Sequence, residues 1–249
     1  MGAAEILDHA VEAHGGLDRF ERTERVAADL RLSGLAFPLK FQRGAFKDYT
    51  GTVSTRRPYA VLAPHPKPGQ RGVFDNGDVR IETDAGEVLA ERKDARAAFG
   101  LRQNLWWDDL DLLYFGGYAL WGYVVAPFIF TRPEYEVEEI EPWREDGEEW
   151  KGLRVRFPEG VPAHSREQRY YFGPDGLIRR NDYTAEVFGG WAKAAHYCWD
   201  HRDFGGFKIP TRRVAMPRGP RGRPVRAIKI VRIAVDDVRV ESVPESAYR

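Results

Sequence analysis

Apolar and polar positions alternate in short segments along most of the chain after Arg25. The first half contains, in order, VAADLRLSGLAFPLKF, GAFKDYTGTV, RPYAVLA, RGVFDN, DVRIETD and EVLAERK. Turn residues separate these segments about every ten positions, which is typical of antiparallel strands that follow one another in a meander. No helical segment long enough to connect parallel strands lies between them, so the pattern predicts an antiparallel sheet.

Two other segments have the periodicity of helices. In residues 1–16, the apolar side chains and one histidine fall on a single helical face, and Gly15 and Gly16 follow as a stop signal. Residues 94–130 interrupt the strand pattern with an aromatic-rich segment. The spacing therefore predicts an N-terminal helix over 1–16 and an inserted helical segment over 94–130.

The inserted segment carries an aromatic stripe. Tyr114, Tyr118 and Trp121 are spaced i, i+4, i+7 and share one helical face, and Trp106 and Trp107 precede them. Such a stripe can simply fill a core. It can also form the wall of a pocket for a large apolar ligand, because aromatic bodies are apolar and the polar tips can orient a ligand. Both interpretations remain open at this point.

The stretch Leu112–Phe130 is also long enough to raise the question of a membrane span, since its nineteen residues carry no formal charge. Three glycines and Pro127 weaken a continuous apolar helix, and aspartates rather than Lys or Arg precede the stretch. We therefore expect a buried or ligand-facing helix, and a protein that is not integral to a membrane.

After this insertion the strand pattern resumes over residues 134–241, without a linker or a low-complexity segment. We predict a single domain over 1–249. Its fold class is mainly β (α+β), with one large antiparallel sheet, an N-terminal helix and an inserted helical cover.

Charge is balanced in total but not along the chain. Thirty-eight basic residues match thirty-eight acidic ones, while Glu134–Glu149 is strongly acidic and Lys208–Arg232 contains basic residues without an acidic neighbour. We interpret these segments as solvated hairpins of opposite sign that lie close in space. Because interleaved aromatic residues are missing from the basic segment, we expect no nucleic-acid partner.

The cysteine content and the N-terminus bear on the compartment. Cys198 is the only cysteine, so no internal disulfide can form. The N-terminal residues include acids where a secretory signal has a basic region and an apolar core. These features predict a cytoplasmic protein.

A recognisable order of motifs runs through the last hundred residues: GLRVRFP, YYFGPDGLIRRNDY, AHYCWDHRDFGGFKIPTRRVAMP and KIVRIAVDDVRV. A turn with D-G-L, an R-x-D triplet, a Gly-Phe-x-x-Pro strand and a final amphipathic strand resemble the C-terminal strands of the LolA-like, LppX-like superfamily of lipoprotein carriers. The resemblance covers mainly residues 151–241. It implies a strongly curved half-barrel whose concave face is covered by helices, with a hydrophobic cavity for acyl chains or other lipophilic molecules.

Candidate chemistry is spread over neighbouring strands, and no complete catalytic motif can be quoted from the sequence. Strand alternation places Arg180 and Asp182 on one face and Tyr183 on the other. It likewise separates His196 from His201. If these two strands pair, Asp182 could approach His196, raise the pKa of the imidazole and fix its tautomer for acid–base catalysis. An ion pair or a hydrogen-bonded histidine on the outer face is the simpler alternative. Because the histidines are divided between faces, we expect no metal site, and no motif indicates a cofactor.

Three classes of function fit these observations. The leading hypothesis is a soluble protein that binds a lipophilic small molecule or acyl group between a curved sheet and an aromatic cover. The alternative is a cofactor-independent enzyme of the cyclase or isomerase type, which would use Asp182, Tyr183 and His196 as acid–base or orienting groups. A structural module would follow if the aromatic segment packed without a cavity. The oligomeric state and the identity of the ligand stay open. The expected ligand-binding residues are Trp106, Trp107, Tyr114, Tyr118, Trp121, His164, Arg180, Trp199 and His201.

Overall fold

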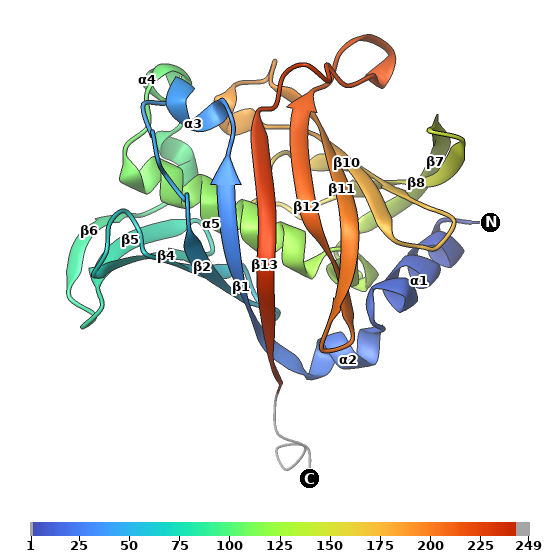
Figure 1. The fold of residues 1–249 in the computed structure, drawn as a ribbon, viewed down its shortest axis with the longest axis horizontal. Coiled ribbons are helices and arrows are strands. Elements are labelled where there is room, and N and C mark those ends of the chain that lie inside the picture. Colours follow the sequence, from blue (N-terminus) through green and yellow to red (C-terminus); the bar gives the residue numbers. More distant parts are fainter. Residues whose placement is uncertain (1, 243–249) are drawn as a thin grey trace.

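The fold is one continuous antiparallel sheet that curves around a central helix (Figure 1), as seen in a computed structural model that describes residues 2–242. Thirteen strands follow the order β6-β5-β4-β3-β2-β1-β13-β12-β11-β10-β9-β8-β7. The sheet is not closed, because β6 and β7 form its two edges. The predicted mainly β (α+β) half-barrel is confirmed. The single domain over 1–249 stays a prediction, and residues 1 and 243–249 lie outside the described part.

The first half of the sheet is a meander of neighbouring strands. Tight turns connect several of them; between β4 and β5, for example, Asn76 and Gly77 have φ angles of 46° and 106°. A turn with two positive φ angles matches the twist of antiparallel strands and favours Asn-Gly. These strands are β1 (Thr23–Ser33), β2 (Tyr49–Ser54), β3 (Tyr59–Ala63), β4 (Gln70–Asp75), β5 (Asp78–Thr83) and β6 (Val88–Arg92).

The second half is another meander, and its last strand returns to the first. β13 pairs with β1 in antiparallel fashion, so the first and last strands lie side by side at the middle of the sheet. This long-range pairing joins the two meanders into one surface. The strands are β7 (Glu136–Glu145), β8 (Glu148–Arg156), β9 (Glu167–Phe172), β10 (Ile178–Thr184), β11 (Lys193–Phe204), β12 (Phe207–Pro217) and β13 (Val231–Ser242).

The α-helices lie at the N-terminus, between β1 and β2, and between the two meanders. The predicted face of α1 is the buried one, and a second short helix, α2, follows before β1. The sequence after Gly34 was expected to continue a strand but forms the short helix α3, because Pro38 has no N–H for a ladder. The α-helices are α1 (Ala3–His14), α2 (Leu17–Arg22), α3 (Ala36–Leu39), α4 (Leu101–Leu105) and α5 (Asp109–Val125). Short 3-10 turns are η1 (Ala95–Ala98), η2 (Phe128–Thr131), η3 (Glu186–Phe188) and η4 (Pro220–Gly222).

Two carboxylates cap the N-terminus of α5. Asp108 accepts a hydrogen bond from the Asp111 backbone N–H at 2.8 Å, and Asp111 accepts one from the Asp108 N–H at 3.2 Å. Arg92 of β6 donates to both carboxylates, at 2.6 and 2.7 Å. Acidic side chains are favourable here because the first turn of a helix has unpaired N–H groups and a partial positive charge.

Glycines let α5 approach the first meander closely. A Cβ added at Gly116 would meet the Phe46 ring at 2.8 Å, and one added at Gly117 would overlap Phe74 of β4. A glycine of the sheet has the same role. Leu120 of α5 packs against Gly51 of β2, and a Cβ added at Gly51 would overlap the Leu120 side chain. The aromatic helix is therefore docked onto β2–β4 over its first three turns.

No helix among residues 2–242 combines the length and the apolar character that a bilayer span requires.

The acidic and basic segments do lie close together, as expected. Glu145 at the end of β7 forms an ion pair with Arg226 in the loop between β12 and β13. The same loop places the Gly222 carbonyl 2.5 Å from the Arg180 guanidinium. These contacts tie the far edge of the sheet to its centre.

We expect Gly117→Ala to lower the free energy of unfolding by about 1–3 kcal/mol, because the added methyl group overlaps Phe74 in a closely packed layer. Gly122→Ala is the matched control on the same helix. Its Cβ meets no atom within 4 Å, so the gain in helix propensity should raise stability by up to about 1 kcal/mol. Urea unfolding at constant pH measures both changes, and equal effects would contradict the close packing at Gly117.

Candidate functional site

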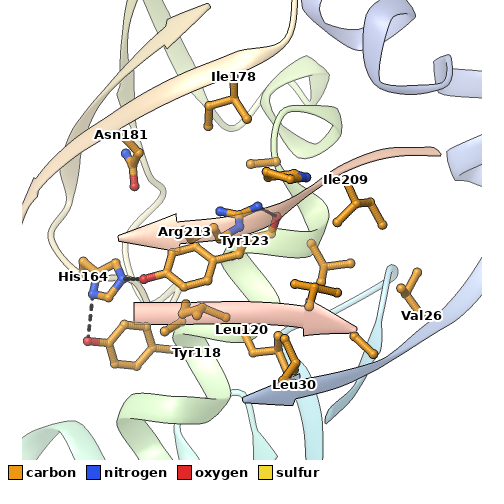
Figure 2. Close-up of a pocket in the computed structure, with 18 of the residues that line it drawn as sticks. Val26, Leu30, Tyr118, Leu120, Tyr123, His164, Ile178, Asn181, Ile209 and Arg213 are labelled. Carbon is orange, nitrogen blue, oxygen red and sulfur yellow. Dashed lines mark hydrogen bonds between the residues drawn. The ribbon is translucent and has the colours of Figure 1, made fainter. Parts of the chain in front are cut away.

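A mainly apolar cavity lies between the C-terminal half of α5 and the central strands β1, β12 and β13 (Figure 2). Its volume is about 100 Å³. The aliphatic wall comes from alternate residues of the two central strands, and the helix closes the opposite side. The residues that line it include Val26, Ala28, Leu30, Tyr118, Leu120, Gly122, Tyr123, His164, Gln168, Ile178, Asn181, Ile209, Arg213, Ile233 and Val235.

The cavity extends along α5 from the closely packed turn at Gly116 to its last turns. Gly116 and Gly117 touch the first meander, but a Cβ at Gly122 would meet nothing within 4 Å. The next turn of the helix thus stands away from the sheet. Inward-pointing Leu30 of β1 and Ile233 of β13 leave apolar surface facing this space.

A chain of tyrosines and histidines borders one end of the cavity. The His164 ring lies between two hydroxyls: Tyr118 Oη is 3.2 Å from Nδ1, and Tyr123 Oη is 2.8 Å from Nε2 (Figure 2). Tyr123 Oη is 3.5 Å from Tyr183 Oη, which in turn is 3.4 Å from Nδ1 of His196. The His164 and Tyr183 rings are stacked with centroids 3.9 Å apart.

The members of this chain are neutral at ordinary pH. Burial lowers the pKa of His164 to about 3, and burial together with the charge of Arg213 lowers the pKa of His196 well below its usual value. Burial also raises the pKa of Tyr123 to about 12. Such groups can orient a ligand or pass a proton along hydrogen bonds, but none supplies a charged base.

One charged side chain lies in the cavity. Arg213 of β12 is 7% exposed, and one of its Nη atoms donates to the Tyr123 backbone oxygen at 3.3 Å. Its guanidinium lies over the Tyr123 ring, 4.9 Å from the centroid. Arg213 was not among the residues expected from the sequence.

The aromatic residues expected to form the wall of the pocket lie in different places. Tyr118 lines the cavity, whereas Tyr114 packs toward Phe74 and Phe99 on the side of the first meander. Trp107 is fully buried, and its Nε1 donates to the Gln103 carbonyl at 2.9 Å. Trp121 is buried too, and its Nε1 donates to the Ser54 carbonyl at 3.1 Å. Trp106 is 41% exposed, next to the exposed Leu105.

The polar residues expected on β10 and β11 are also divided, by the two faces of the sheet. Arg180 and Asp182 lie on the outer face, joined by hydrogen bonds of 2.6 and 2.7 Å, and Arg180 also donates to Tyr197 at 3.1 Å. Trp199 stacks on Tyr197 on that same face. None of the three predicted residues Arg180, Asp182 and Trp199 lines the cavity.

The expected approach of Asp182 to His196 is wrong. The two strands do pair, but the register sets Asn181 opposite His196 and Asp182 opposite Ala195. Side chains of directly opposed residues share a face, so Asp182 points away from His196. The pKa of His196 is lowered rather than raised, because burial and Arg213 act on it without a carboxylate.

His201 also lies on a different face from the one expected. Asp200 has a φ of 57°, which breaks the alternation of β11. His201 therefore turns toward α1, where its ring centroid is 6.3 Å from that of His14, a cavity residue. Within residues 2–242, no three His, Cys, Asp or Glu side chains gather as a metal site would require.

Several cavity residues were not identified from the sequence. Tyr123 follows the predicted stripe by two positions, and Gln168 and Asn181 look like ordinary strand residues. The aliphatic wall of β1 and β13 was visible only as alternation, which does not say what each face meets. The signal that could have drawn attention to Arg213 is its position between Arg212 and Val214 on a strand, where one of two adjacent arginines must face inward.

We expect acid to destabilise the fold through His164. Its pKa is about 3 in the folded state and about 6.5 when unfolded, so the unfolded chain gains a proton as pH falls below 6.5. Between pH 7 and pH 5 this single group should cost about 2 kcal/mol of unfolding free energy. Urea unfolding of His164→Gln at several pH values should show that its free energy of unfolding depends less steeply on pH than that of the wild type, by about one proton. His9→Gln, at an exposed position, is the control; an unchanged slope in His164→Gln would refute the assignment.

Comparisons with known proteins show similarity in structure only. The sequence matches no protein-family model and no curated protein. The structure is similar to a LolA superfamily protein from Nitrosomonas europaea, with 13% identity, 100% of this chain and 98% of that chain covered, and a TM-score of 0.54. It is also similar to a DUF1329 family protein from Desulfovibrio piger, with 12% identity, 99% and 96% coverage, and a TM-score of 0.51. The curved sheet with its helical cover therefore has a LolA-like fold.

Proposed function

We propose that the protein binds a lipophilic small molecule or a single acyl group in the cavity between α5 and the central strands. The observation that carries the proposal is an apolar cavity between the last turns of α5 and the central strands, where Gly122 leaves open space. A close-packed interior normally leaves few spaces larger than a water molecule. A mainly apolar cavity with a few polar groups in its wall is the usual form of a small-molecule site.

The size of the cavity limits the ligand. Its volume of about 100 Å³ is well above the roughly 10–15 Å³ that a single water molecule needs. A single medium-length chain or a compact ring system matches this volume, whereas a lipid with two long chains exceeds it. The LolA-like fold supports the proposal at the level of architecture.

The affinity of the cavity for neutral alkanols should increase with the length of their carbon chain. Each buried methylene group contributes about 0.8 kcal/mol, so calorimetric titration should show an increase in affinity of about fourfold per carbon from 1-hexanol to 1-octanol. Gly122 lines the cavity and a Cβ there meets no atom within 4 Å, so Gly122→Leu should fill part of the cavity and weaken 1-octanol binding at least tenfold. Gly122→Ala controls for helix propensity. Equal binding by Gly122→Leu and the wild type would place the ligand elsewhere.

The enzyme alternative is favoured by one observation, the hydrogen-bonded chain from Tyr118 to His196. Tyr183 and His196, two of the three residues expected to act in catalysis, belong to this chain, and Tyr123 brings it to the cavity surface. A bound substrate could therefore exchange a proton with Tyr123 and be held in a reactive conformation.

If the protein is an enzyme, breaking the hydrogen-bonded chain from Tyr118 to His196 should leave the substrate, and not the product, bound in the cavity. We expect Tyr123→Phe to accumulate an unreacted precursor when the protein is purified from its own host and its ligand is extracted; because substrate and product can be isomers of equal mass, the precursor is recognised by its chromatographic retention time and fragmentation. Asp182→Asn is the control, since Asp182 lies on the outer face. A carrier instead retains the same compound, by retention time and fragmentation, in the wild type and in both variants, and that result would exclude the enzyme.

A further inference from the structure

Arg213 is a buried cation that the protein itself does not neutralise. It stands on β12 opposite Cys198 of β11 and Ile233 of β13, at the centre of the sheet, and its side chain points inward. Figure 2 shows its guanidinium among Tyr123, Ile178 and Ile209. Among the described residues, no carboxylate forms an ion pair with it, and its one hydrogen bond goes to the Tyr123 carbonyl.

Two other arginines of β10 and β12 are paired. Arg180, fully buried on the outer face, has Asp182 at 2.6 Å. Arg212, the exposed neighbour of Arg213, has Asp200 at 2.8 Å. Burying a charge without a partner is costly, and buried arginines are normally paired. The fold thus supplies a carboxylate on the outer face and none in the cavity.

A purely structural role for Arg213 explains only one of its hydrogen-bond donors. The Tyr123 carbonyl belongs to the last turn of α5, and a cation there interacts favourably with the helix dipole. A guanidinium carries five N–H donors, however, and this contact uses one of them. The remaining donors have no partner among the described residues, and Arg213 forms part of the cavity wall.

The neighbouring titratable groups add no second charge. Burial is the largest cause that lowers the pKa of His14, His196 and His201, and the charge of Arg213 lowers each further. These imidazoles are therefore neutral near pH 7. Lys208 at the edge of the cavity is exposed and pairs with Asp203 at 3.2 Å. The interior of the cavity thus holds a single positive charge.

We propose that the ligand of this cavity is an amphiphile with one carboxylate, which pairs with Arg213 while its apolar part lies along β1 and β13. The inference rests on the proposed function and names its ligand class. A carboxylate matches the planar fork of a guanidinium and balances one positive charge. A phosphate monoester carries close to two negative charges near pH 7 and would leave one of them unpaired in this volume.

The test compares octanoate with 1-octanol and methyl octanoate by calorimetry at pH 7.5 with the full-length protein. Octanoate should bind the wild type at least tenfold more tightly than either neutral probe, because charge-assisted hydrogen bonds add to the same apolar contacts. Arg213→Gln should lose this preference while its affinity for 1-octanol stays within threefold. Arg212→Gln removes the adjacent, outward-facing charge and should keep the preference.

The outcomes separate the two proposals. If neither neutral probe nor octanoate binds the wild type, the proposed function fails and this inference falls with it. If the neutral probes bind and octanoate gains nothing, the cavity is a ligand site but the carboxylate assignment is wrong. The wild-type comparison decides this even if Arg213→Gln does not fold. Retained preference for octanoate in a folded Arg213→Gln protein would equally overturn the role of Arg213.

Discussion

The close contact between α5 and the first meander is the constraint from which the rest of the structure follows. Gly116 and Gly117 remove the side chains that would hold the helix away from Phe46 and Phe74. Once the first three turns are docked there, the helix direction is set, and its last turns cross the centre of the sheet at a distance. Gly122 then faces open space, and the cavity is the volume left between a straight helix and a curved sheet.

The two faces of β10–β12 show how one set of strands supports two kinds of polar chemistry. On the outer face, Arg180 is buried with Asp182 and a tyrosine hydroxyl, so its charge is fully compensated. On the inner face, burial keeps His196 neutral, as it does the adjacent His164 that precedes β9, and Arg213 is a buried charge without a carboxylate partner. The compensated pair needs no further partner, whereas the uncompensated charge of Arg213 is the basis for the carboxylate ligand that we propose.

The sequence identified much of the neighbourhood of the site without its geometry. Tyr118, His164, Tyr183 and His196 were each chosen on their residue type and position, and the structure joins them through hydrogen bonds. Asp182 was placed beside His196 because both strands were expected to pair. The pairing was right and the register was off by one residue, which moves a side chain to the opposite face. The roles predicted for these residues stay predictions.

The sequence by itself determined the antiparallel sheet, the buried face of the first helix and the position of the aromatic insertion. These depend on local periodicity and turn residues, which can be read along the chain. Only the tertiary structure decided which aromatics reach the cavity, where His201 turns, and that Arg213 has no carboxylate beside it. Those features depend on strand register, on a single positive φ at Asp200 and on the β1–β13 pairing of distant segments. Because a change of one residue in register exchanges the faces of a strand, local patterns cannot specify them.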